Sequence, residues 1–119
     1  MIIQNLRTKI FVCKAPVDMR ASFDTLFEKV KSLLEGDPFS GHLFVFINSR
    51  RSHCKCLYYD GTGLVLIAKR LEKGLNFCKI NPLFSAEIKL TQAEFNLFFE
   101  GADLNKRFIE SPRPVKKVS

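Results

Sequence analysis

The spacing of hydrophobic positions changes along the chain, and each spacing predicts a different element. Residues 9–13 favour a short strand that Pro16 closes. Residues 43–47 are apolar at every position, which is typical of a strand covered on both faces. Residues 54–59 and 64–70 favour two more strands, because the Asp60-Gly61-Thr62-Gly63 segment between them is typical of a hairpin turn.

Two segments follow a helical period instead. The first, residues 23–34, carries apolar side chains at i, i+3, i+4 and i+7. We expect Ser22 as the N-cap of this helix and Gly36 at its C′ position. The second begins with Thr91-Gln92-Ala93-Glu94, which matches a capping box, and predicts a shorter helix. Phe77 and Ile88 are assigned to edge strands around an irregular stretch.

These elements predict an α+β fold with an antiparallel sheet of about four to five strands, one long helix on a face and a short C-terminal helix. The 119 residues suit one domain, which we assign to residues 1–109. Residues 110–119 are basic and lack a packing pattern, so we expect a disordered tail there.

The hydrophobic runs are too short for a membrane span, since the longest, residues 43–47 and 64–68, have five residues each and a span needs about 18. The first residues lack the basic start and long apolar stretch of a signal peptide. We therefore expect a cytoplasmic protein that does not contact a membrane.

Two cysteines close together raise a zinc hypothesis. His53-Cys54-Lys55-Cys56 offers several ligands, but structural zinc sites usually need a second pair, and Cys13 and Cys78 are isolated. The alternative is that Cys54 and Cys56 leave one face of a strand as small core residues. We favour the core hypothesis and expect no metal and no cofactor.

One weak catalytic pattern is present. Asp60 together with Glu87-Ile88-Lys89 meets the bare requirement of a metal-dependent nuclease, although Asp60 is better explained as the first residue of the turn. The sequence lacks a Gly-x-Ser-x-Gly elbow and a phosphate-binding glycine loop. We therefore expect no catalytic residues and no enzyme, with a nuclease as the minor alternative.

Charge is the stronger signal. The net charge is +7, and residues 50–79 hold seven Lys or Arg against two acids. Antiparallel order would bring loop 48–53 and segment 69–74 to the same end of the sheet, and clustered cations suit phosphate. The alternative is a solvated rim. The candidate nucleic-acid-binding residues are Arg50, Arg51, Lys55, Lys69, Arg70 and Lys73.

Several segments carry a resemblance beyond their physical pattern. Residues 18–20 (Asp-Met-Arg), residues 36–46, and Asn48-Ser49-Arg50-Arg51 followed by residues 55–61 and 69–74 occur in a characteristic order. In these segments the chain resembles the TnpB accessory protein, the second open reading frame product of the insertion-sequence-66 family of bacterial transposable elements. Asp18 and Arg20 match the Asp-x-Arg of that family, and a pair two positions apart at a strand-to-helix junction also suits a structural salt bridge, which we favour over a functional role. Asp60 with Gly61 matches the turn of the family, and we assign all four as structural motif residues.

The resemblance implies a non-catalytic accessory role in DNA transposition and two partners, DNA and the transposase of the same element. We expect binding through the basic sheet edge. The alternative is a protein-interaction subunit that contacts the transposase through exposed Phe side chains and does not touch DNA. Cys54 and Cys56 stand where this family usually has aliphatic residues, which agrees with the core hypothesis.

Overall fold

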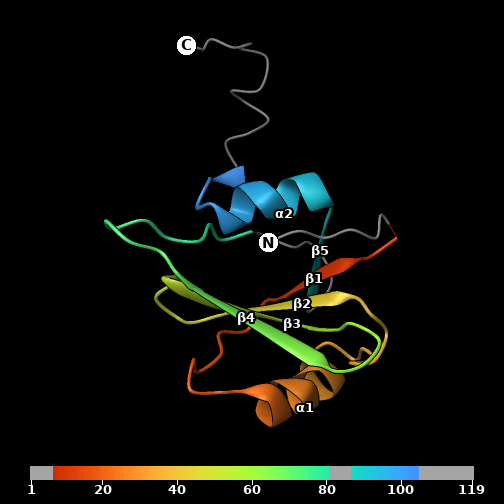
Figure 1. Ribbon diagram of the computed structural model, residues 1–119. Coiled ribbons are helices and arrows are strands. Elements are labelled where there is room, and N and C mark those ends of the chain that lie inside the picture. Colours follow the sequence, from red (N-terminus) through yellow and green to blue (C-terminus); the bar gives the residue numbers. More distant parts are fainter. Residues whose placement is uncertain (1–6, 81–86, 105–119) are drawn as a thin grey trace.

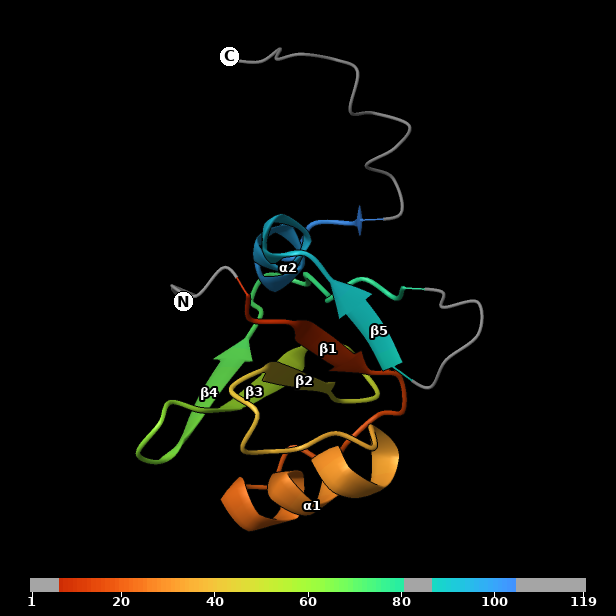
Figure 2. The same cartoon turned by 90° about the vertical axis from the view of Figure 1, so that its right-hand side faces the viewer.

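The computed structural model describes residues 7–80 and 87–104, and the predicted tail at residues 110–119 lies outside them. Five strands form one sheet in the order β4-β3-β2-β1-β5. Two helices lie on opposite sides of that sheet (Figures 1 and 2). The elements are β1 (Ile10–Cys13), α1 (Phe23–Leu33), β2 (Leu43–Ile47), β3 (His53–Tyr59), β4 (Leu64–Arg70), β5 (Glu87–Leu90) and α2 (Gln92–Phe99).

The sheet is mixed, so the predicted antiparallel sheet is wrong. β1 pairs with β2 in parallel, with Ile10 opposite Leu43, whereas the other three pairs are antiparallel. Parallel neighbours need a long crossover, and the chain between β1 and β2 provides it by running through α1. The hydrophobic pattern located the strands but could not show that β2 returns beside β1.

The predicted long helix is also wrong, because α1 has 11 residues. It stops where Glu35 takes a left-handed backbone with φ of 52°, so Glu35 and not Gly36 occupies the C′ position. Gly36 suits its position for another reason: a Cβ here would stand 3.0 Å from the Phe44 ring, which leaves little room for a larger residue. Ser22 is the N-cap, as expected, but its side chain makes no capping hydrogen bond.

The two faces of the sheet bury separate hydrophobic clusters. Under α1, Leu26 and Val30 pack with Phe44, Phe46 and Leu57. All five residues of β2 are buried, which confirms a strand covered on both faces. The cluster on the α2 side contains Ile10, Val12, Leu43, Val45, Ile47, Cys54, Cys56, Leu71, Phe77, Leu90, Phe95, Phe98 and Leu104.

Of the remaining sequence predictions, two are confirmed and one is wrong. The capping box of α2 is confirmed, since Thr91 Oγ1 accepts from Glu94 N at 3.0 Å and Glu94 Oε1 accepts from Thr91 N at 2.9 Å. Ile88 lies in the edge strand β5, as expected. Phe77 does not lie in a strand: it is a buried core residue whose N–H donates to Arg51 O at 2.7 Å.

Neither helix of the described residues is long and apolar enough to cross a membrane.

Candidate nucleic-acid interface

Loop 48–53 and the residues after β4 meet at one end of the strands, which we call the sheet end. His53 pairs with Arg70 in the β3–β4 ladder, and the N–H of Leu71 donates to Ser52 O at 2.9 Å. The expected neighbourhood of these two segments is therefore confirmed. The conformation of loop 48–53 determines which of its cations are exposed there.

The loop is held by Asn48. Its Oδ1 accepts from Ser52 N at 2.9 Å and from His53 N at 3.1 Å. Arg51 takes a left-handed backbone with φ of 60°, and its N–H donates to Asn48 O at 3.0 Å. This turn leaves Arg50 exposed while Arg51 is half-buried.

The Arg51 side chain forms hydrogen bonds within the protein. Its Nε donates to Phe77 O at 2.8 Å and its Nη2 donates to Cys78 O at 2.6 Å. Partial burial lowers the pKa of Arg51, although the group stays charged at neutral pH. The guanidinium therefore ties segment 77–78 to the sheet end, and these two donors do not point to solvent.

Lys55 and Lys69 lie on opposite faces of the sheet. Lys55 Nζ donates to Ala21 O at 2.7 Å on the α1 side. Lys69 Nζ donates to Phe99 O on the α2 side and stands 4.4 Å from the centroid of the Phe99 ring. Both ammonium groups thus anchor a segment that packs on the sheet, and neither lies beside Arg50.

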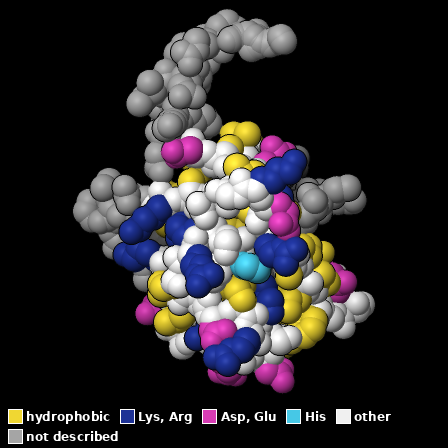
Figure 3. Space-filling model, turned by 90° about the vertical axis from the view of Figure 1, so that its left-hand side faces the viewer, with side chains coloured by type: hydrophobic (Ala, Val, Ile, Leu, Met, Phe, Trp, Pro, Cys, Tyr) yellow, Lys and Arg dark blue, Asp and Glu magenta, His cyan; other side chains and the backbone are white. Residues whose placement is uncertain are grey.

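Three of the six candidate residues remain exposed at the sheet end: Arg50, Arg70 and Lys73. Arg70 Nε lies 2.7 Å from Glu72 Oε2, so its charge is partly neutralised. Lys73 and Gly74 both have positive φ, 57° and 76°, in the tight turn after β4. One face of the molecule shows its Lys and Arg side chains in several separate groups with acids close to some of them (Figure 3).

A groove borders the sheet end beside the loop that carries Asp18. It has a volume of about 440 Å³ and is lined in part by Asp18, Arg50, Ser52 and His53. Asp18 Oδ2 pairs with Arg20 Nη2 at 2.7 Å, and the Arg20 side chain and backbone N–H lower the pKa of Asp18 to about 2. This ion pair agrees with the structural interpretation of Asp18 and Arg20.

Asp60 and Gly61 lie at the other end of the β3–β4 hairpin. Asp60 Oδ1 accepts from Thr62 N at 2.9 Å and from Gly63 N at 3.0 Å, and these bonds lower the pKa of Asp60. Gly61 has φ of 107°, which glycine adopts without strain. The hairpin turn is confirmed. Because β2 and β1 separate β3 from β5, Asp60 and the 87–89 segment do not form the nuclease pattern.

Cys54 and Cys56 are fully buried in the cluster on the α2 side, which confirms the core hypothesis. A hydrogen bond with Cys54, followed by burial, raises the pKa of Cys56 well above its ordinary value. Metal ligands are thiolates, so a thiol held in this way is a poor one. Within residues 7–80 and 87–104, no three His, Cys, Asp or Glu side chains gather as metal ligands.

A second set of cations was missed by the sequence analysis. Arg7, Lys9 and Lys89 line a groove of about 580 Å³ beside the start of β1 and the end of β5. Lys9 and Lys89 are eighty positions apart, and only the β1–β5 pairing brings them together. A prediction of that pairing would have been needed to find the groove.

The profile of the family described as IS66 Orf2 like protein matches residues 8–108. An uncharacterized protein of Sinorhizobium fredii, y4jC, is 33% identical over 109 residues, covering 92% of this chain and 89% of the relative. A second uncharacterized protein of that organism, y4hO, is 37% identical over 71 residues, or 60% of each chain. No solved structure matches.

The chain therefore belongs to the IS66 Orf2-like family, as its sequence motifs indicated. This membership associates it with an accessory role in transposition.

Proposed function

We propose that this protein supports transposition by binding DNA phosphates at the sheet end. The single observation that carries the proposal is the meeting of loop 48–53 with the turn after β4. Two of the exposed cations there, Arg50 and Lys73, have no acidic partner among the described residues. Backbone turns with positive φ at Arg51 and Lys73 keep both segments in place.

The contact set is smaller than the sequence alone indicated. Arg51, Lys55 and Lys69 donate to carbonyls of the protein, which leaves Arg50, Lys73 and the half-neutralised Arg70. Each phosphate contact contributes about −0.9 to the slope of log affinity against log salt, so we expect the sheet end to contribute between about −1.8 and −2.7 to that slope. Through this contribution alone, a rise from 50 to 200 mM salt weakens binding by about 12- to 40-fold.

A gel-shift salt titration with duplex DNA tests the proposal. Replacing Arg50 and Lys73 by Ala should make the slope shallower by about 1.8 on every duplex, because phosphate contacts carry no base information. The matched control replaces Lys29 and Lys31 of α1 by Ala, which removes the same charge elsewhere. Equal effects of the two double variants would show that the sheet end is only a solvated rim.

A second candidate function rests on aromatic rings near α1. Phe39 is 56% exposed, and its ring centroid lies 5.2 Å from that of Phe27 and 5.2 Å from that of Tyr59. Phe23, 43% exposed, belongs to the same helix as Phe27. Exposed aromatic clusters are typical of protein interfaces, so this surface would suit the transposase.

Co-purification with the transposase of the same element separates the two functions. If the aromatic surface is the interface, Phe39→Ser should abolish co-purification with or without DNA. If binding is carried by DNA, the Arg50/Lys73 double variant should lose the complex and nuclease treatment should dissolve it.

A further inference from the structure

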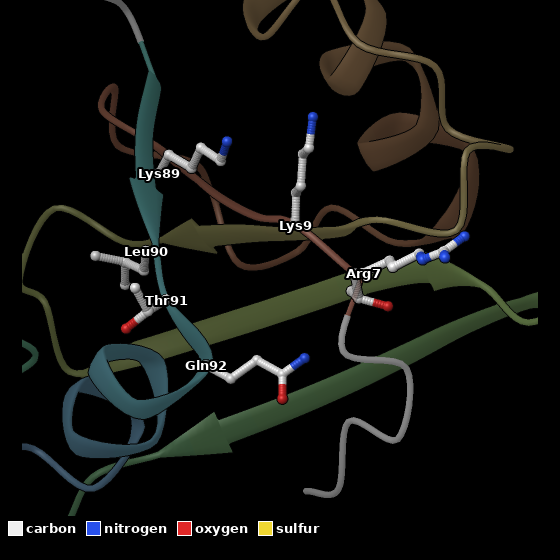
Figure 4. Close-up of a pocket in the computed structure, with 7 residues that line it drawn as sticks. Arg7, Lys9, Lys89, Leu90, Thr91 and Gln92 are labelled. Atoms are coloured by element: carbon white, nitrogen blue, oxygen red, sulfur yellow. The ribbon is translucent and has the colours of Figure 1, made fainter.

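The groove beside β1 and β5 has a surface of one sign. Its lining consists of Arg7, Thr8, Lys9, Lys89, Leu90, Thr91 and Gln92, which include three cations and no acid. Lys9 and Lys89 project from neighbouring segments toward the same side (Figure 4). Neither ammonium group has an acidic partner within the described residues.

The strand register explains why the two lysines come together. Lys89 lies opposite Phe11, and one step beyond the Ile10–Leu90 pair places Lys9 opposite Thr91. Directly opposed residues share a face of the sheet, so Lys9 and Lys89 are diagonal neighbours about 7–8 Å apart. Two flexible ammonium groups at this spacing reach one phosphate or two consecutive ones.

His42 adds a hydrogen-bond donor on the same side. Its Nδ1 accepts from the Lys9 N–H at 3.0 Å, so the proton of the neutral ring is on Nε2. The ring also stands edge-on to Phe11, with centroids 5.9 Å apart. Partial burial is the main cause that lowers the pKa of His42, and the Lys9 and Lys89 charges lower it further, as positive neighbours do.

The groove and the sheet end lie at opposite ends of the strands. β1 begins and β5 ends at the groove, whereas loop 48–53 follows the far end of β2, which runs parallel to β1. The five residues of β2 alone separate the two ends by about 16 Å. One nucleic-acid segment bound at the sheet end would therefore leave the groove free for another.

We propose that the groove lined by Lys9 and Lys89, with His42 beside it, is a second phosphate-binding surface that takes the backbone of a nucleic acid. The groove is open, and Lys9 and Lys89, which line it, are exposed, which suits a chain of phosphates better than an enclosed small anion. The proposal rests on the proposed function in one respect, since both assume DNA as the partner. It adds a second contact through which one molecule could hold two DNA segments.

The two histidines of the chain make the proposal testable, because His42 lies at the groove and His53 lies at the sheet end. NMR signals of the two rings are followed while a short duplex is added at low salt. We expect the His42 signal to move and its pKa to rise on binding, since bound phosphate offsets the two lysine charges. Replacing Lys9 and Lys89 by Ala should abolish the His42 response and make the salt slope shallower by about 1.8.

The same titration on the Arg50→Ala/Lys73→Ala variant distinguishes the two surfaces. If His42 still responds there while the salt slope of that variant equals that of the parent, the sheet end fails and the groove stands. A duplex that moves His53 but leaves His42 unchanged overturns the groove. The Lys29→Ala/Lys31→Ala variant controls for net charge, and an unchanged thermal midpoint shows that each variant is folded.

Two further ligands determine whether the groove selects nucleic acid. Inorganic phosphate should move His42 only at concentrations at least 100-fold above those of the duplex, because it offers one anion in place of a chain of them. Poly-glutamate should be weaker than the duplex at equal charge. If poly-glutamate moves His42 as strongly as DNA does, the groove binds an acidic protein segment and the proposal is overturned.

Discussion

The sheet end and the groove both gather Lys and Arg, but they use these side chains in opposite ways. At the sheet end Arg51 donates to carbonyls and Arg70 pairs with an acid, so much of the local charge is already engaged. At the groove Lys9 and Lys89 have no acidic partner among the described residues. Density of charge in the sequence is therefore a poor measure of the charge that a surface offers to a ligand.

The largest change in the free energy of unfolding should come from replacing Arg51. Replacing it by Met keeps the length of the side chain but removes the donors to Phe77 O and Cys78 O. Leaving these part-buried acceptors without partners should lower the free energy of unfolding by about 2–3 kcal/mol. Arg50→Met removes the same charge from an exposed position and should change it by less than about 0.5 kcal/mol. Urea unfolding of both variants tests the comparison, and equal losses would contradict the internal role of Arg51.

Replacing Lys69 should cause a smaller loss in the free energy of unfolding. Lys69→Met gives up the hydrogen bond to Phe99 O and the contact of the ammonium group with the Phe99 ring. We expect a loss of about 1–2 kcal/mol and faster hydrogen exchange in α2, which this lysine fastens to β4. Lys73→Met is the matched control and should leave exchange in α2 as it is in the parent protein. Parallel behaviour of the two variants would place Lys69 with the solvated cations.

Local signals in the sequence predicted local structure. The Asp60-Gly61 turn and the Thr91–Glu94 capping box depend on residues three apart, and both are present. The buried strand 43–47 is apolar at every position, which is enough to predict cover on both faces. The family motif was found in the same way, from short ordered segments.

Long-range pairing is what the sequence could not supply. The β1–β2 pair is parallel because the chain passes through α1 between them, and no local pattern encodes the direction of return. The groove could not be predicted for the same reason, since only the β1–β5 pairing brings Lys89 close to Lys9. Arg50 and Arg51 are adjacent and chemically equal, and only the turn at Arg51 directs one outward and the other inward.

His42 sharpens the comparison through pH. The pKa of His42 in the folded protein lies below the ordinary 6.5, so the unfolded chain binds the proton first as pH falls. The stabilisation is therefore present above pH 6.5 and is lost as pH falls through the lower folded pKa. Lys89→Ala should raise the pKa of His42 and reduce this loss. Urea unfolding at pH 7.5 and pH 5 measures it, and His42→Asn, which keeps an acceptor near Lys9 N, should remove the His42 contribution.

The smallest effect belongs to Asp18, because its pair with Arg20 is exposed on both sides. The pKa of Asp18 is about 2 against 3.8 for the free group, so its stabilisation is present above pH 3.8 and is lost as pH falls toward 2. Arg20→Gln removes the side-chain bonds but keeps the bond from the backbone N–H of residue 20 at 2.8 Å. The Asp18 pKa should then rise but stay below 3.8. Carboxyl NMR titration measures both values. At neutral pH this variant should unfold at the same urea concentration as the parent, because exposed ion pairs contribute little.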